Sequence, residues 1–138
     1  VRAAPPVRSW RFDPAWDDVA RRVRDELAAE LRDVGFDGER RTDVQLVFAE
    51  LLSNAVRYAP GTIDLIVERT DERIVLHLLD RGPGYRVNPN LPSDLYSEFG
   101  RGLFLVATFC ERFVVERRAG GGSHARVTFT RPPGGPQP

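Results

Sequence analysis

The chain has 138 residues, 41% of them hydrophobic and 29% charged, which suits one folded globular domain and excludes wholesale disorder. Twenty basic residues balance twenty acidic residues, so no general positive field is available to attract nucleic acid. No apolar run approaches the roughly 20 residues of a membrane span. No signal-peptide pattern opens the chain either, so we expect a cytoplasmic protein without membrane contact.

Cysteine and lysine usage narrows the kinds of site further. The single Cys110 cannot form an internal disulfide and has no ligand cluster around it in sequence, so we interpret it as a small buried apolar residue. All twenty basic residues are arginine, which excludes the phosphate-binding lysines of P-loop proteins and eukaryotic-type protein kinases. A nucleoside triphosphate would have to be held by backbone amides, arginine and a metal ion.

Two helices are predicted in the first half of the chain. Asp13 as N-cap and Pro14 at the first helical position begin the first helix, whose apolar residues recur at helical spacing until Gly35. The second runs from about residue 39 to residue 58 and ends before Pro60. Each helix has an apolar stripe that predicts packing against a second layer.

Five segments have the composition of strands: residues 8–12, 62–69, 73–79, 113–118 and 125–130. A long loop is expected over residues 81–100, followed by a short helix near residues 102–111. This order predicts an α+β two-layer sandwich, in which helices cover one face of a mixed, mostly antiparallel sheet. We expect the domain to span residues 9–131, between flexible segments at residues 1–8 and 132–138.

Polar residues gather on one edge of the second predicted helix. At about 100° per residue, Glu50, Asn54 and Arg57 fall within roughly 60° of one another. A carboxylate can take a proton from a hydroxyl, an amide oxygen suits Mg²⁺, and an arginine can bind phosphate oxygens. Taken alone, the same residues are more typical of a solvated helix face than of a ligand site.

Two glycine-containing segments follow. In "LLDRGPGY", Asp80 ends a strand and precedes Gly82 and Gly84, so its carboxylate could accept a hydrogen bond from an exocyclic amine while the glycines allow close approach of a ligand. In "EFGRGLFLVATF", Gly100 and Gly102 precede an apolar helix whose first amides could hold phosphate. Each segment alone is also compatible with an ordinary turn or helix cap.

Together, in this order and on these elements, the three segments resemble the N, G1 and G2 boxes of the GHKL or Bergerat ATPase superfamily, over about residues 9–130. The resemblance implies the histidine-kinase-like ATPase fold and binding of ATP with Mg²⁺. It implies that Glu50 is the general base, Asn54 the Mg²⁺ ligand and Asp80 the adenine anchor. The other nucleotide-binding positions that it implies are Arg57, Tyr58, Gly82, Gly84, Gly100, Arg101, Gly102 and Ser123.

Within this superfamily, "GRGLFLV" and the short stretch before it resemble the anti-sigma-factor serine/threonine kinases of bacteria. That resemblance implies transcription regulation through a protein partner, such as a sigma factor or an anti-sigma-factor antagonist, without direct contact to nucleic acid. A homodimer is compatible with it.

Two alternatives stay open. The first is the catalytic ATP-binding half of a sensor histidine kinase, which Tyr58 favours and Glu50 disfavours. The second is a non-catalytic ATP-binding domain that sequesters a partner. His77 and His124 fall in or beside strands, so we expect ordinary sheet and surface roles for them and no phosphoacceptor role.

Overall fold

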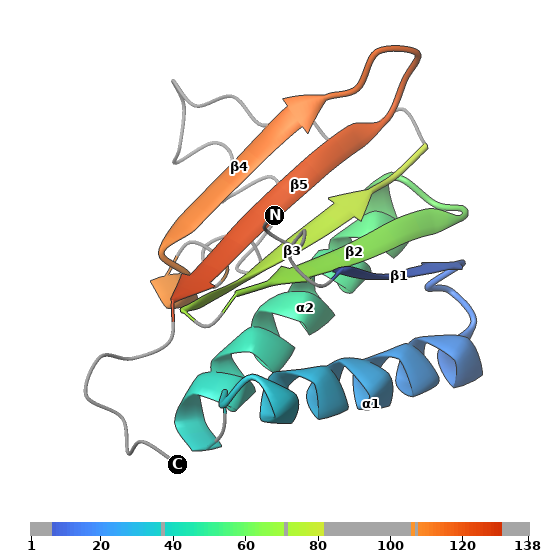
Figure 1. Cartoon of the computed structure of the whole chain (residues 1–138). Helices are drawn as coiled ribbons and strands as arrows, with labels where there is room; N and C mark the ends of the chain where they lie inside the picture. Colours follow the sequence, from blue (N-terminus) through green and yellow to red (C-terminus); the bar gives the residue numbers. More distant parts are fainter. Residues whose placement is uncertain (1–6, 37, 71, 82–105, 107, 131–138) are drawn as a thin grey trace, which may run out of the picture.

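The computed structural model describes residues 7–36, 38–70, 72–81, 106 and 108–130. Its elements in chain order are β1 (Val7–Phe12), α1 (Asp17–Asp33), α2 (Gly38–Tyr58), β2 (Ile63–Arg69), β3 (Arg73–Leu79), β4 (Arg112–Arg117) and β5 (Ser123–Thr130). Figure 1 shows two layers, a twisted sheet and the two helices that cover one of its faces. The predicted α+β sandwich is therefore confirmed.

The sheet has five strands in the order β1-β2-β3-β5-β4, and all four pairings between the described strands are antiparallel. We expected a mixed, mostly antiparallel sheet, whereas the described strands contain no parallel pair. β5 lies between β3 and β4, so the end of β3 lies beside the start of β5, where Leu79 pairs with His124. This long-range pairing carries Asp80 to the β4–β5 hairpin.

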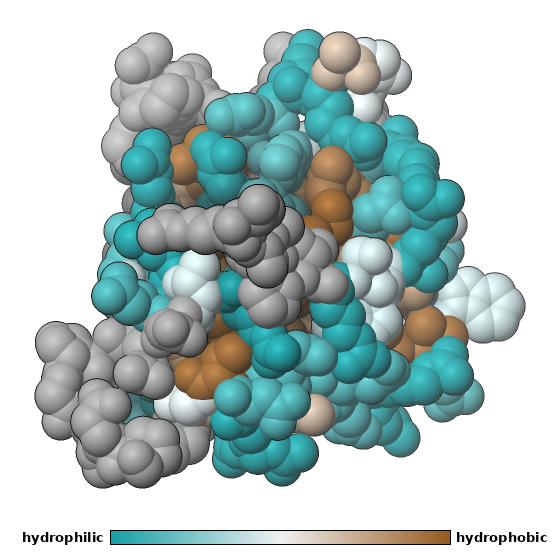
Figure 2. All heavy atoms as spheres, viewed as in Figure 1, coloured by the Kyte–Doolittle hydropathy of each residue, from teal (hydrophilic) through white to brown (hydrophobic). Residues whose placement is uncertain are grey.

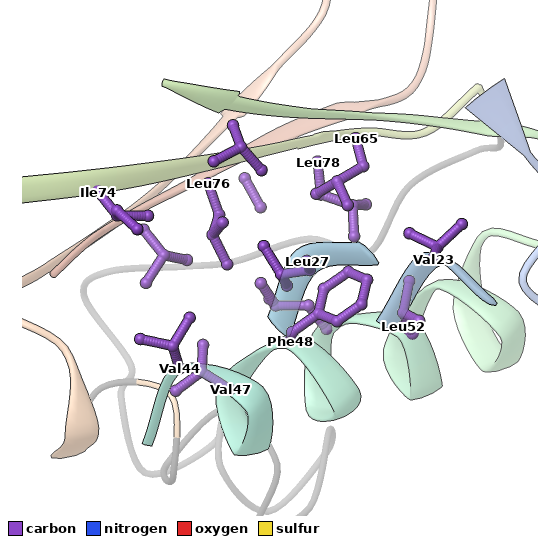
Figure 3. Packing of buried hydrophobic residues seen from close by; sticks show 14 of the residues in the cluster. Val23, Leu27, Val44, Val47, Phe48, Leu52, Leu65, Ile74, Leu76 and Leu78 are labelled. Carbon is purple, nitrogen blue, oxygen red and sulfur yellow. The ribbon is translucent and has the colours of Figure 1, made fainter. Parts of the chain in front are cut away.

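The core lies between the two layers. Alternate residues of β2, β3 and β5 are buried, as expected for strands with one face toward helices and the other toward solvent. Burying each large apolar side chain stabilises the fold by roughly 1.5–3 kcal/mol relative to exposure. Figure 3 shows side chains from both layers that meet there: Val23 and Leu27 of α1, Val44, Val47, Phe48 and Leu52 of α2, and Leu65, Ile74, Leu76 and Leu78 of the sheet.

The first helix begins later than the sequence predicts. Asp13 was expected to cap it, but its carboxylate accepts a hydrogen bond from the N–H of Ala15 at 3.0 Å, and its carbonyl accepts one from the N–H of Trp16 at 3.1 Å. Asp13 therefore closes a turn before the helix, and α1 starts at Asp17. The end of the helix agrees with the prediction, because α1 ends two residues before Gly35, whose φ is 82°.

The other boundaries agree closely with the prediction. β1 is the expected edge strand and begins at Val7, inside the segment that we expected to be flexible. Of the short helix expected near residues 102–111, the described residues Val106, Thr108 and Phe109 are helical. The long loop expected over residues 81–100 lies outside the described residues except for Arg81.

Hydrophilic residues cover most of the face seen in Figure 2, with small apolar areas between them. Among the described residues, the exposed large hydrophobic side chains are Trp16 and Val56. None of the described helices has the length and apolarity needed to cross a membrane.

Candidate functional site

Three polar residues are buried in the described part of the chain. Asn54, Asp80 and Ser123 are 5%, 1% and 5% exposed. Burying a polar group costs free energy unless the group is hydrogen-bonded, so a buried polar side chain marks either an internal network or a ligand site. All three residues belong to the nucleotide-binding set predicted from the sequence.

The fold brings the three residues' elements to one end of the domain. Helix α2 ends at Tyr58, and β2 begins at Ile63 after a short link. At the start of β2, Asp64 pairs with Leu79 of β3, which in turn pairs with His124 of β5. The end of α2, the end of β3 and the start of β5 are therefore neighbours.

Arg81 ties two of these elements together. Its guanidinium donates to the carbonyl oxygen of Thr62 at 3.4 Å and to Oδ2 of Asp64 at 2.8 Å. Thr62 lies in the link between α2 and β2, so the residue after Asp80 is fixed to the segment that follows Tyr58. Arg81 was not among the site residues predicted from the sequence, because an arginine after a strand has no distinctive pattern.

Asp80 and Ser123 form a reciprocal pair. The N–H of Asp80 donates to the carbonyl oxygen of Ser123 at 3.0 Å, and the N–H of Ser123 donates to Oδ1 of Asp80 at 3.1 Å. A hydrogen bond from a backbone N–H to one carboxylate oxygen restricts rotation of the side chain. The carboxylate is thus held in one orientation at the end of β3.

The β4–β5 hairpin turn lies against the same residue. The side chain of Arg118 donates to the carbonyl oxygen of Asp80 at 2.7 Å. Gly122 is buried with φ at 90°, and a Cβ atom there would lie 2.1 Å from that carbonyl oxygen. The contacts of Arg118 and Gly122 with Asp80 were not predicted from the sequence, since they depend on the β3–β5 pairing.

On α2, the predicted polar edge runs from buried to exposed. Asn54 is buried, Glu50 is half-buried, and Arg57 is exposed with its guanidinium 5.5 Å from the ring centroid of half-buried Tyr58. Nδ2 of Asn54 makes no hydrogen bond to a described residue. The edge is therefore not simply a solvated helix face.

The donor chemistry of this helix edge fits a Mg²⁺ ion. The oxygen of the Asn54 amide is a hard ligand of the kind that Mg²⁺ prefers, whereas its unpartnered Nδ2 is a hydrogen-bond donor that suits a phosphate or water oxygen. The carboxylate of Glu50 is one helical turn away. Mg²⁺ usually takes one or two protein oxygens and completes its octahedron with water and phosphate oxygens.

Five predicted site residues lie outside the described residues. They are Gly82, Gly84, Gly100, Arg101 and Gly102. Their nucleotide-binding role stays a prediction from the sequence.

The two histidines and the cysteine have no part in the predicted site. His77 and His124 lie on the sheet face that points away from the helices, with Nδ1 of His77 2.8 Å from Nε2 of His124. Cys110 is half-buried and packs against the core, and burial followed by the charge of Glu111 raises the pKa of its thiol to about 11. A thiol with so high a pKa is a poor nucleophile near neutral pH, which agrees with a packing role.

Comparisons with known proteins identify the domain. Among curated proteins, none matches the chain in sequence. A solved structure described as the histidine kinase domain of the E. coli osmosensor EnvZ is 16% identical, with a TM-score of 0.49, over 100% of this chain and 96% of that one. Residues 13–129 match the family described as the histidine kinase-like ATPase domain. Since this match covers most of the chain, the protein belongs to the histidine kinase-like ATPase domain family.

Proposed function

We propose that this chain is an Mg-ATP-binding regulatory domain that acts as a serine/threonine protein kinase on a partner protein. One observation gives the main support for nucleotide binding. Three polar residues are buried in the described part of the chain, and all three were predicted from the sequence to bind a nucleotide: Asn54, Asp80 and Ser123. Membership of an ATPase family supplies the ligand class.

Asp80 recognises the base in this proposal. Its carboxylate is held by the N–H of Ser123, and it accepts a hydrogen bond from the exocyclic amine of adenine. Because Asp80 is 1% exposed, the hydrogen bond forms away from water and contributes more than it would at the surface. Gly82 and Gly84, which follow Asp80 in sequence, would let the chain pass close to the nucleotide.

The α2 edge acts on the phosphate end of the nucleotide. Asn54 holds Mg²⁺, which supplies neutralisation of the charge on the phosphate oxygens. Because the chain contains no lysine, arginine must supply the positive charge at the phosphates, and Arg57 is exposed in the last turn of α2, where it can do so. Gly100, Arg101 and Gly102 complete the phosphate contacts in the proposal.

Glu50 distinguishes a kinase from a simple binding domain. A half-buried carboxylate one helical turn from the metal ligand can accept the proton of an attacking hydroxyl group. A neutral imidazole nucleophile needs no such base, so this residue favours serine or threonine over histidine as the acceptor. The partner that fits is a regulatory protein, such as a sigma factor or an anti-sigma-factor antagonist, inside the cell.

The test is transfer of label from ATP. The domain is incubated with γ-labelled ATP, Mg²⁺ and lysate of the source organism, in parallel with the Glu50→Gln variant, and labelled proteins are treated with acid or base. We expect acid-stable label on a partner with the wild-type domain and much less with the variant. Phosphoserine and phosphothreonine survive acid, whereas the P–N bond of phosphohistidine hydrolyses once the ring nitrogen is protonated.

The other outcomes each contradict the proposal. Acid-labile label would assign the chain to a histidine kinase. ATP binding without any transferred label would assign it to a regulator that sequesters its partner. Label that is unchanged by Glu50→Gln would remove that residue from the chemistry.

A further inference from the structure

The turn between β4 and β5 contacts the strand end that carries Asp80. Within the turn, the N–H of Arg118 donates to the carbonyl oxygen of Gly122 at 3.0 Å, and the N–H of Gly121 donates to the carbonyl oxygen of Arg118 at 3.2 Å. These two bonds close the turn. Its position next to Asp80 depends on the two hydrogen bonds between Asp80 and Ser123 and on the contacts of Arg118 and Gly122.

Gly122 can lie close to the main chain of Asp80 because it has no side chain. A Cβ atom at this position would lie 2.1 Å from the carbonyl oxygen of Asp80 and 3.1 Å from Cα of Arg81. The obstacle is backbone, so it cannot move aside as a flexible side chain would. Any other residue at position 122 must push the turn away from the end of β3.

Arg118 binds the same carbonyl oxygen. Its guanidinium donates to the carbonyl oxygen of Asp80 at 2.7 Å, a short charge-assisted hydrogen bond from a half-buried side chain. The bond is made to the main-chain oxygen of Asp80 and not to its carboxylate. Arg118 therefore fixes the backbone of Asp80, while the N–H of Ser123 fixes its side chain.

We propose that Arg118 and Gly122 are positioning residues that aim the carboxylate of Asp80 and so set the selectivity of the site for the purine base. This inference rests on the proposed role of Asp80 as adenine anchor. Neither residue touches the nucleotide in this proposal. Both act through the position and direction of the Asp80 carboxylate.

The position and direction of the Asp80 carboxylate determine which purine base the site prefers. Adenine presents an exocyclic amine that donates to the carboxylate, whereas hypoxanthine presents a carbonyl oxygen, which is an acceptor facing another acceptor. A site built to receive an N–H rejects an analogue that lacks it, provided that the two groups are in register. A displacement of about 1 Å weakens the wanted hydrogen bond and relieves the unwanted contact together.

The experiment measures the affinities of ATP and inosine triphosphate, both with Mg²⁺, by calorimetry. We expect Arg118→Ala and Gly122→Ala to reduce the ratio of the two affinities by about 10-fold or more, mainly through weaker ATP binding. Arg118→Lys keeps a donor for the Asp80 carbonyl and should restore part of the ratio.

Matched control variants distinguish a change in the position of the Asp80 carboxylate from general damage to the β4–β5 hairpin. Gly120 has φ of 87°, close to the 90° of Gly122, but a Cβ atom there would have no atom of the described residues within 4 Å. Gly120→Ala therefore carries similar backbone strain without the contact to Asp80, and Arg117→Ala removes the same charge from an exposed neighbour. Both should keep the wild-type ratio.

The outcomes distinguish this inference from the proposed function. If the wild-type domain does not prefer ATP, or if Asp80→Asn keeps the preference, Asp80 is not the adenine anchor and the proposed site is wrong. If Asp80→Asn loses the preference while Arg118→Ala and Gly122→Ala keep it, the positioning role alone is wrong. Equal loss in Gly120→Ala and Gly122→Ala would also overturn it, and Arg118→Ala decides the matter if Gly122→Ala does not fold.

Discussion

Asp80 and Ser123 exchange two hydrogen bonds across the end of β3 and the start of β5, each N–H donating to an oxygen of the other residue at 3.0 and 3.1 Å. The pair combines a strand contact with an oriented carboxylate. Burying a carboxylate costs free energy unless hydrogen bonds compensate for the lost water. Asp80 is 1% exposed, and the N–H of Ser123 supplies one of these hydrogen bonds while it orients the carboxylate.

The first prediction concerns this carboxylate. Asp80→Asn should weaken ATP binding by about 10- to 100-fold, because an amide accepts less strongly and brings an N–H group toward adenine's amine. The thermal midpoint should change little, since the amide oxygen can still accept from Ser123. Calorimetry and thermal unfolding measure the two effects. Glu116→Gln makes the same carboxylate-to-amide change at an exposed ion pair with Arg126 and should leave ATP affinity unaltered.

The second prediction concerns Asn54 and the metal. ATP should bind with useful affinity only when Mg²⁺ is present, and Asn54→Ala should remove most of the Mg²⁺-dependent part. Because Nδ2 of Asn54 has no partner among the described residues, the substitution should leave the thermal midpoint near that of the wild type. Titrations with and without EDTA test this. Asn54→Asp retains an oxygen ligand and should keep Mg²⁺ dependence; equal binding in EDTA would contradict the metal assignment.

The third prediction separates chemistry from binding at Glu50. Glu50→Gln should keep ATP affinity within a few fold while phosphoryl transfer falls by roughly 10²-fold or more, since the amide cannot accept the hydroxyl proton. Single-turnover transfer rates and calorimetric affinities are measured on the same preparation. Unchanged transfer would exclude the base role, and a parallel fall of affinity and rate would indicate that Glu50 instead supports nucleotide binding.

The two layers of the fold could be predicted from the spacing of apolar residues, because that spacing shows which face of each helix or strand is buried. Helix α2 and strand β3 lie where the sequence places them, since burial of one face dictates apolar residues at helical or alternate spacing. The start of α1 could not be predicted in the same way. Asp13 and Pro14 suit a helix cap and a turn equally, and in the structure the turn is formed.

The candidate site divides along the same line. Residues that lie close in sequence, such as Glu50 and Asn54, could be assigned from one helix. Arg118 and Gly122 could not be assigned in this way, because they contact Asp80 only where β3 pairs with β5. In that pairing Leu79 lies opposite His124, more than forty positions later in the sequence. Asn54 was expected at a polar edge and is in fact buried, which no helical projection alone reveals.

The last prediction concerns the two histidines on the outer face of the sheet. Nε2 of His124 lies 2.8 Å from Nδ1 of His77, and Oε1 of Glu68 lies 2.7 Å from Nε2 of His77 but outside hydrogen-bonding geometry. Glu116 pairs with His124 in register, and Arg126 pairs with His77. Burial first, and then the charges of His77 and Arg126, lower the pKa of His124 from its usual 6.5, whereas Glu116 opposes the shift.

A lowered pKa in the folded state means that the unfolded chain binds the proton of His124 more readily. The contribution of His124 to stability is therefore fully present above about pH 6.5 and is lost as the pH falls toward its folded pKa. Denaturant unfolding between pH 7.5 and pH 5 should show a smaller loss of stability for His124→Gln than for the wild type. Other acidic groups titrate in both proteins, so the difference between the two curves isolates this histidine. Parallel curves over that range would show that protonation of His124 is not coupled to unfolding.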